Sequence, residues 1–307
     1  MTVDPTELLA NLNAVKRAVQ STTAFKTILD DEWFDTIERR IVENSPSQIV
    51  TADQTGFLRD FSHPLRGAAW FENDQELALT GRQAEVDAAG KPALASFGPD
   101  PLRTVLPALD SRFASFAALP FKTEIVQRKL NEIRTARFSP AFRNHLFELS
   151  VLGDLARRGV LVDIEDRATR VDGTIVLDDR EILVEATNTT QSVNPLINSP
   201  FPRDLAKEVN QVRDKVKKKV TNGRQLALAN GKPTLLFLAR WQWGASREAA
   251  DWVLEECFGL RDFAALSGVV LADSYLFHVT SWRPAKSPDV PLSDREIAFL
   301  EEWYGNR

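Results

Sequence analysis

Six short runs of aliphatic and β-branched residues occupy the second half of the sequence. Runs of this length and composition predict β-strands, and strands mixed with helical stretches predict a sheet covered by helices. The runs are Val160–Ile164, Thr174–Leu177, Ile182–Ala186, Thr234–Ala239, Val269–Ala272 and Leu276–Thr280. The helical stretches are 203–222, 246–258 and a helix that begins at Ser139–Pro140 and ends at Arg158–Gly159, where glycine serves as the C-cap. This half of the chain is therefore predicted to be a mixed α/β sheet flanked by helices.

The first part of the chain has a different pattern. Apolar residues recur every three or four positions from Pro5 to Glu43 and from Leu102 to Thr135, which predicts amphipathic helices. Prolines, glycines and polar residues interrupt any period in residues 44–100, so we expect loops there. We therefore predict a mainly helical N-terminal region, residues 1–135, followed by an α/β domain, residues 136–307. The N-terminal helices are a candidate surface for a protein partner.

Composition narrows the class of protein. With 43% hydrophobic and 26% charged residues, the chain resembles globular proteins rather than disordered ones. The net charge of −5 excludes a uniformly basic surface, although a local basic face is compatible with it. The single cysteine, Cys257, cannot form an internal disulfide, and no stretch approaches the ~20 apolar residues of a membrane span. We expect a cytoplasmic protein that does not enter a membrane, with its oligomeric state left open.

Two acidic residues interrupt the predicted hairpin at 171–188. With a two-residue turn at Asp178–Asp179, Asp172 lies directly opposite Glu185, and with a four-residue turn it lies opposite Thr187. Side chains alternate along a strand, so both registers place Asp172 on the face that carries Glu185 and Thr187. Like charges on facing strands repel each other. The pair therefore predicts a cation or a shared proton at this face.

A third acid precedes the hairpin. Glu148 is followed by the apolar residues Val151, Leu152 and Leu155, three, four and seven positions later, which places it on the apolar face of its helix. A glutamate on such a face should be paired or should coordinate a cation.

A purely structural interpretation of these acids stays open at this point. Glu148 would then pair with one of three nearby arginines, Arg143, Arg157 or Arg158, and Asp172 would only open a turn with Gly173.

The order of these residues resembles the PD-(D/E)XK, or restriction-endonuclease-like, nuclease superfamily. A helix with Phe-Glu-Leu is followed by a strand pair with an Asp and a Glu, then a lysine-bearing helix and a strand, over roughly residues 138–240. Asp172 matches the motif aspartate, with Val171 in place of the proline. Glu185 and Thr187 match the first and last positions of (D/E)-x-Lys, and Glu148 matches an acid of the first core helix. The resemblance implies a restriction-endonuclease-like fold for residues 136–307.

The resemblance also implies a function. Members of the superfamily bind Mg²⁺ or Mn²⁺ through the strand carboxylates, so Asp172, Glu185 and Glu148 are the expected metal ligands. The expected activity is metal-dependent hydrolysis of phosphodiester bonds in nucleic acid, with DNA as the favoured substrate. The alternative is a catalytically inactive, nuclease-like module that binds nucleic acid or a protein.

The motif lysine is replaced by Thr187, which carries no positive charge. In some members of the superfamily the lysine lies on a neighbouring element, and residues 203–224 contain eight basic and three acidic residues. Lys219 is our first candidate for the catalytic lysine, and Lys215 is the second. Lys215, Lys218, Lys219 and Arg213 are the candidate contacts to nucleic-acid phosphates. The alternative is a solvated helix face, which is what most lysine-rich helices present.

Overall fold

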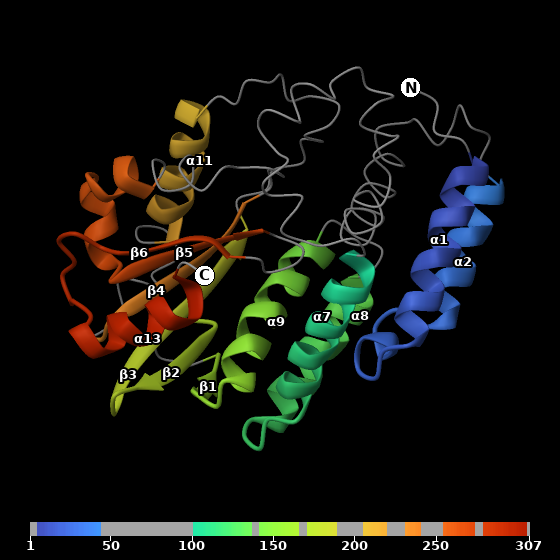
Figure 1. Cartoon of the computed structure of the whole chain (residues 1–307), viewed down its shortest axis with the longest axis horizontal. Helices are drawn as coiled ribbons and strands as arrows, with labels where there is room; N and C mark the ends of the chain where they lie inside the picture. The colour runs from blue at the N-terminus through green and yellow to red at the C-terminus, as the bar shows by residue number, and fades with distance from the viewer. Residues whose placement is uncertain are drawn as a thin grey trace.

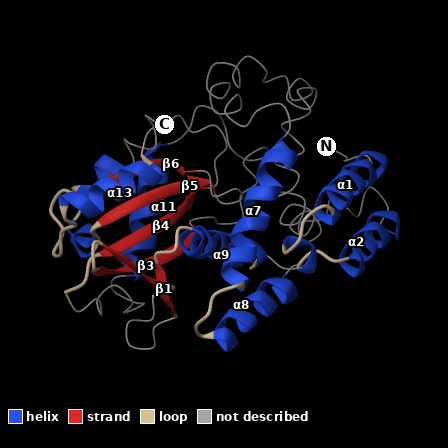
Figure 2. Ribbon diagram, turned by 60° about the horizontal axis from the view of Figure 1, so that its bottom comes forward, coloured by secondary structure: helices blue, strands red, loops and turns tan. Residues whose placement is uncertain are grey.

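The computed structural model describes residues 5–43, 101–136, 141–165, 171–188, 205–219, 231–240, 254–273 and 279–305. Six described strands form one mixed sheet in which sequence order and spatial order agree (Figures 1 and 2). The strands are β1 (Leu161–Ile164), β2 (Gly173–Leu177), β3 (Arg180–Asn188), β4 (Thr234–Arg240), β5 (Gly268–Asp273) and β6 (Val279–Pro284). The predicted α/β fold with a mixed sheet is confirmed.

The strand directions divide the sheet into three parts. The pairs β1–β2 and β2–β3 are antiparallel, β3–β4 and β4–β5 are parallel, and β5–β6 is antiparallel again. Parallel neighbours require a crossover connection, and α11 (Leu205–Lys217) lies in the crossover between β3 and β4. The sheet is therefore antiparallel at both edges and parallel at its centre.

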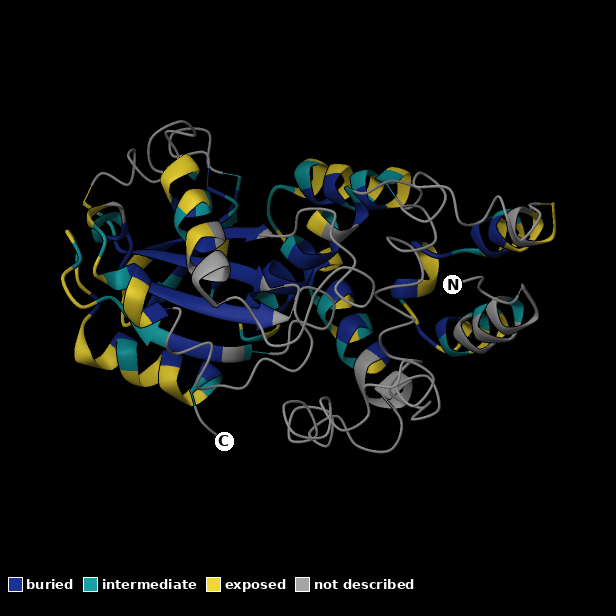
Figure 3. Ribbon diagram, turned by 90° about the horizontal axis from the view of Figure 1, so that it is seen from above, coloured by how far each residue is buried: buried dark blue, intermediate teal, exposed yellow. Residues whose placement is uncertain are grey.

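Helices cover both faces of the sheet, and the strand residues divide between them. Odd-numbered β4 residues such as Leu235 and Phe237 belong to a hydrophobic cluster with residues of α9 (Phe142–Arg157). Even-numbered residues such as Leu236 belong to a second cluster with Val212 and Val216 of α11. Figure 3 shows the central strands fully buried between these layers. A strand buried on both faces reads as a continuous apolar run, which is what β4 shows.

Most of the other described α-helices lie on the α9 side of the sheet or next to it. They are α1 (Pro5–Gln20), α2 (Asp31–Glu43), α7 (Pro101–Ala117), α8 (Thr123–Ala136) and α13 (Asp294–Tyr304). Gly153 of α9 lies where α7 crosses, and a Cβ atom there would come within 2.4 Å of the Arg112 carbonyl oxygen. The Asp110 carboxylate of α7 accepts the backbone N–H groups of Thr23, Ala24 and Phe25 at 2.6–2.9 Å. This carboxylate fixes the segment between α1 and α2 against α7.

The hydrophobic cluster on the α9 side extends from Val19 to Tyr304 and includes residues of α1, α7, α9 and the sheet. The N-terminal helices and the sheet therefore share one core in the described part of the chain. The division at residue 135 stays a prediction. None of the described helices combines the length and the apolar character that a membrane crossing requires.

The predicted helix end, helix cap and last strand can be compared with the structure. Gly159 has φ +74° and follows α9 in a Schellman arrangement, with the N–H of Val160 bonded to the carbonyl of Leu155. The predicted cap Ser139 lies outside the described residues, and α9 begins at Phe142. The last strand begins at Val279, later than the predicted run 276–280, and residues 274–278 are not described.

One helix was not predicted at all. Helix α13 begins after Ser293, whose hydroxyl accepts the N–H of Glu296 while the Glu296 carboxylate accepts the N–H of Ser293. This reciprocal capping box satisfies two backbone donors that a helix N-terminus otherwise leaves unpaired. The sequence signal, Ser-x-x-Glu before an apolar run, was therefore present.

Candidate functional site

The hairpin formed by β2 and β3 has the register of the two-residue turn. Gly173 pairs with Val184 and Leu177 with Arg180, and both turn residues, Asp178 and Asp179, have positive φ. Two consecutive residues with positive φ are typical of a type I′ turn, which matches the twist of a hairpin. The same register, extended by one residue beyond the ladder, places Asp172 at the position opposite Glu185.

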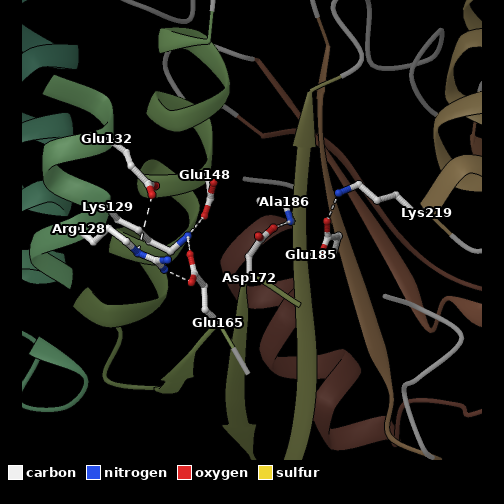
Figure 4. A network of polar contacts seen from close by, with 9 residues as sticks. All are labelled: Arg128, Lys129, Glu132, Glu148, Glu165, Asp172, Glu185, Ala186 and Lys219. Atoms are coloured by element: carbon white, nitrogen blue, oxygen red, sulfur yellow. Dashed lines mark hydrogen bonds and ion pairs between the residues drawn. The ribbon is translucent and has the colours of Figure 1, made fainter. Parts of the chain in front are cut away.

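Asp172 lies directly before β2, where the ladder with β3 ends. Its Oδ2 atom accepts the backbone N–H of Ala186 at 2.8 Å. Figure 4 shows the Asp172 carboxylate beside β3 at Ala186, with Glu185 and Lys219 beyond the strand. Both strand acids therefore lie next to β3, Asp172 at the N–H of Ala186 and Glu185 across the strand in Figure 4, and their convergence on one face stays a prediction.

Glu185 and Thr187 lie on the face of the sheet that α11 covers. The parallel pairing aligns Glu185 with Leu236 and Thr187 with Leu238, and both leucines belong to the cluster packed against α11. Glu185 is fully buried, and its Oε1 atom forms an ion pair with the ammonium group of Lys219. Its Oε2 atom is also buried and has no hydrogen-bond partner among the described residues. A buried carboxylate oxygen without a donor is costly, which suggests a ligand that completes it.

Burial and repulsion from nearby carboxylates raise the pKa of both strand acids. The pKa of Asp172 lies well above its ordinary value because the carboxyl is buried and because Glu148 and Glu185 repel its charge. Lys129 and the N–H of Ala186 offset only part of that effect. Burial likewise raises the pKa of Glu185, although Lys219 counteracts it. The site therefore holds more negative charge than its surroundings neutralise.

Lys219, the first candidate for the missing lysine, reaches the site from the end of α11. Burial alone would lower its pKa, but the Glu185 carboxylate outweighs burial and raises the pKa above the ordinary value. Lys219 is therefore a charged group in contact with a strand acid. Thr187, at the motif position, is buried on the same face of the sheet as Glu185.

The other basic residues of α11 have different surroundings. Burial, followed by repulsion from Lys219 and Lys218, lowers the pKa of Lys215, and no described acid is paired with it. Lys218 is exposed, and Arg213 forms an ion pair with Asp214 at 3.2 Å. Of the four candidate phosphate contacts, Lys218 and Lys215 are thus not paired with an acid in the described residues.

Glu148 is paired, but not with an arginine. Its carboxylate forms an ion pair with the ammonium of Lys129 of α8, a residue that is 5% exposed. Arg157 and Arg158 both bind Asp154 instead, and the side chain of Arg143 is not described. The arginine alternative is therefore wrong for Arg157 and Arg158, because these side chains lie toward the other end of α9.

Lys129 and its second partner, Glu165, were missed by the sequence interpretation. Lys129 also contacts Glu165 at 2.7 Å, and Arg128 contacts the same carboxylate. The signal for Lys129 was its spacing, since it lies three residues after Val126 and four before Ile133 on the buried face of α8. Glu165 carried no such signal because it follows β1 in an irregular segment.

The residues present fit a divalent cation in one part of the site. Mg²⁺ and Mn²⁺ prefer carboxylate oxygens, and Asp172 with Glu185 offers such oxygens together with an excess of negative charge. Glu148, the third expected ligand, is held by Lys129 in this arrangement. Within the described ranges, no cluster of three or more His, Cys, Asp or Glu side chains is arranged to hold a metal ion. The fit therefore rests on the two strand acids and on the unpartnered Oε2 atom of Glu185.

No family model matches the chain, and neither a curated protein nor a solved structure matches it significantly.

Proposed function

We propose that this protein is a metal-dependent nuclease that hydrolyses phosphodiester bonds in DNA and has a restriction-endonuclease-like α/β core. One observation carries the proposal. Asp172 and Glu185 are two carboxylates on adjacent strands whose pKa values are both raised, and one buried oxygen of Glu185 has no partner among the described residues. Functional sites are where such unneutralised buried charge is found most often.

Each residue of the proposed site has a distinct task. Asp172 and Glu185 would hold Mg²⁺ or Mn²⁺, and the backbone N–H of Ala186 orients the Asp172 carboxylate for that purpose. A bound divalent ion supplies Lewis-acid activation of the scissile phosphate and of a water molecule. The ammonium of Lys219 lies against Glu185, where it provides the positive charge that Thr187 lacks. From there it can orient a phosphate oxygen or a water molecule by hydrogen bonding.

DNA is supported as the substrate by the basic end of α11. Lys217, Lys218 and Lys219 follow one another directly before the site, and Lys217 and Lys218 are exposed. Exposed lysines beside a catalytic carboxylate pair suit the phosphate backbone, which binds by charge rather than by sequence. Replacing Lys218 with methionine should therefore weaken DNA binding uniformly and reduce the salt dependence by about one counterion.

A second candidate function is a nuclease-like module that binds nucleic acid without cleaving it. The observation in its favour is that Lys219 and Lys129 each pair with an acid of the site. Such pairs let the fold tolerate its buried carboxylates without a metal ion. Thr187 at the lysine position agrees with this candidate as well.

Cleavage assays with matched variants separate the two candidates. Plasmid and single-stranded DNA are incubated with Mn²⁺ and wild type, Asp172→Asn, Glu185→Gln, Lys219→Met, Lys215→Met, Lys218→Met or Thr187→Lys. For a nuclease, Asp172→Asn and Glu185→Gln should abolish both cleavage and Mn²⁺ binding measured by calorimetry. Lys219→Met should keep Mn²⁺ binding but slow cleavage by about 10²–10⁴-fold, the usual size of a lost proton-transfer or orienting group. Lys218→Met is the matched control for Lys219→Met, because Lys218 is the exposed lysine next to it and should affect DNA binding rather than the chemical step.

Other outcomes would change the assignment. An inert wild type combined with an active Thr187→Lys variant would identify a binding module derived from a nuclease. Cleavage that survives both Lys219→Met and Lys215→Met would remove the lysine role. A wild type that neither cleaves DNA nor binds Mn²⁺ would contradict the proposed nuclease.

A further inference from the structure

Lys129 is a buried cation among three carboxylates. Its ammonium lies between Glu148 and Glu165, and Figure 4 shows Asp172 beyond them toward β3. The electrostatic attraction of Asp172 also acts on this ammonium. Lys129 comes from α8, which precedes the residues that carry the resemblance to nucleases.

The charges around Lys129 differ from those of an ordinary ion pair. The Lys129 side chain is 6% exposed, and its ammonium is paired with both Glu148 and Glu165. Its single charge thus faces the acids Glu148, Glu165 and Asp172. Arg128 adds a second positive charge only at the outer side of Glu165, where its own side chain is half exposed.

The backbone of Glu165 has an unusual conformation at this position. Glu165 has φ +44°, a left-handed conformation that residues other than glycine adopt at a cost. Its backbone N–H donates to the carbonyl of Asp172 at 3.0 Å, so the two acids are tied together at the end of the β1–β2 ladder. The ion pairs of the Glu165 side chain with Lys129 and Arg128 offset that cost.

We propose that the Lys129 ammonium replaces a second divalent cation in the site, so that the site binds one metal ion through Asp172 and Glu185. This inference rests on the proposed metal-dependent function. Sites that activate phosphodiester bonds commonly use two cations that share a carboxylate. Here Asp172 takes the shared position, because Glu185 lies on one side of it and Lys129 with Glu148 lies on the other. A lysine supplies a fixed positive charge that does not depend on the metal concentration.

The rival explanation is a purely structural ion pair that joins α8 to α9. Lys122 is such a residue, since it binds Asp163 at 2.6 Å and the carbonyl of Ile164 at 2.8 Å near the edge of the sheet. The two explanations differ in one respect. Removing a structural lysine only weakens the fold. Removing a lysine that replaces a metal leaves the carboxylates of Glu148, Glu165 and Asp172 able to bind a cation.

The test counts Mn²⁺ ions bound to the full chain by calorimetry. Wild type should bind one Mn²⁺, and Lys129→Met should bind two. Lys129→Gln keeps a hydrogen-bond donor toward Glu148 without the charge, and it should also bind two. Arg128→Met is the matched control, because it removes a positive charge from the same Glu165 carboxylate and should still bind one. The double variant Lys129→Met with Glu148→Gln should return to one ion.

Thermal unfolding in EDTA and in Mn²⁺ provides a second measurement. Both Lys129 variants should melt below wild type in EDTA and should gain more stability from Mn²⁺ than wild type does. If they fold only in the presence of Mn²⁺, that result also supports the proposal. Variants that stay unfolded at millimolar Mn²⁺ would overturn it, because a divalent ion should restore the lost charge.

The two proposals fail in distinguishable ways. If wild type and both Lys129 variants each bind one Mn²⁺, the proposed role of Lys129 is wrong. The nuclease proposal would then remain intact. A wild type that binds no Mn²⁺ would overturn the proposed function itself.

Discussion

Helix α9 carries an acid on its packed face in each half, the half-buried Glu148 and the buried Asp154, and the two halves have opposite electrostatic character. In the C-terminal half, Asp154 accepts hydrogen bonds from Arg157 and Arg158 at 2.8 Å each and from the hydroxyl of Tyr304 at 3.1 Å. Arg112 lies 3.8 Å away on α7. Burial alone would raise the pKa of Asp154, but these arginines hold it below the ordinary value. This half has an excess of positive partners.

The N-terminal half has too few cations for its acids. Glu148 faces Asp172 and Glu185 across the end of the sheet, and the pKa values of both strand acids are raised. The same helix therefore carries Asp154, whose charge is fully neutralised, and Glu148, which belongs to a group of acids whose charge is not. A complete set of partners locks elements together, as Asp154 locks α7, α9 and α13. An incomplete set costs stability but leaves free energy that a bound cation can recover.

The largest expected effect tests the satisfied half. Asp154→Ala removes the carboxylate that several guanidinium groups share, among them that of the half-buried Arg112. Removing one partner from a buried charge network costs about 3–5 kcal/mol of the free energy of unfolding. Urea unfolding measures this cost, with Glu181→Ala as the control because Glu181 pairs with Lys232 at the surface and should contribute less than about 1 kcal/mol. Equal effects of the two substitutions would remove the distinction between the halves.

The next prediction tests the incompletely satisfied half through its pH dependence. A carboxyl with a raised pKa binds more protons in the folded chain, so the free energy of unfolding falls as pH rises above the ordinary aspartate value of 3.8. Asp172→Asn removes this loss, and asparagine still accepts the N–H of Ala186. The variant should therefore be more stable than wild type at pH 7 in EDTA, by about 1.4 kcal/mol for each unit of the pKa difference.

That gain should disappear as the pH falls below 3.8, where the wild-type group is protonated in both states. Asp154→Asn should show the opposite dependence, because stability from a lowered pKa is present above the ordinary value and is lost as pH falls through the folded value. Urea unfolding from pH 8 to well below 3.8 measures both slopes, because the Asp154 slope lies below that value and the Asp172 slope above it. Parallel curves for the two variants would contradict the comparison.

The smallest expected effect sharpens the description of the Asp154 cluster. Tyr304→Phe removes the hydroxyl that donates to Asp154 and keeps the ring against Phe237. Because the two arginines still satisfy the carboxylate, the loss should be about 1 kcal/mol, the net value of one hydrogen bond. Thermal unfolding at pH 7 measures it. A loss as large as that of Asp154→Ala would mean that Tyr304, rather than the arginines, holds the cluster together.

Local sequence signals predicted much of the site. The sequence left two hairpin registers open, and the structure has the two-residue turn at Asp178–Asp179. The alternation along β3 placed Glu185 and Thr187 on one face in either register. The lysine run of α11 indicated Lys219, which does contact Glu185. The structural alternative for Glu148 considered only arginines near it in the sequence, whereas its partner Lys129 comes from a different helix. Helix α13 was missed although its capping box was visible in the sequence.

The sequence by itself determined features that depend on neighbours along the chain: strands, the glycine end of α9 and the face on which Glu185 and Thr187 lie. These follow from backbone geometry and side-chain alternation, which act over a few residues. Only the tertiary structure decided which charges neutralise one another. Asp154 meets Tyr304 across 150 residues, and Lys219 meets Glu185 across 34. Such pairs depend on how helices pack against the sheet, and no local spacing encodes that packing.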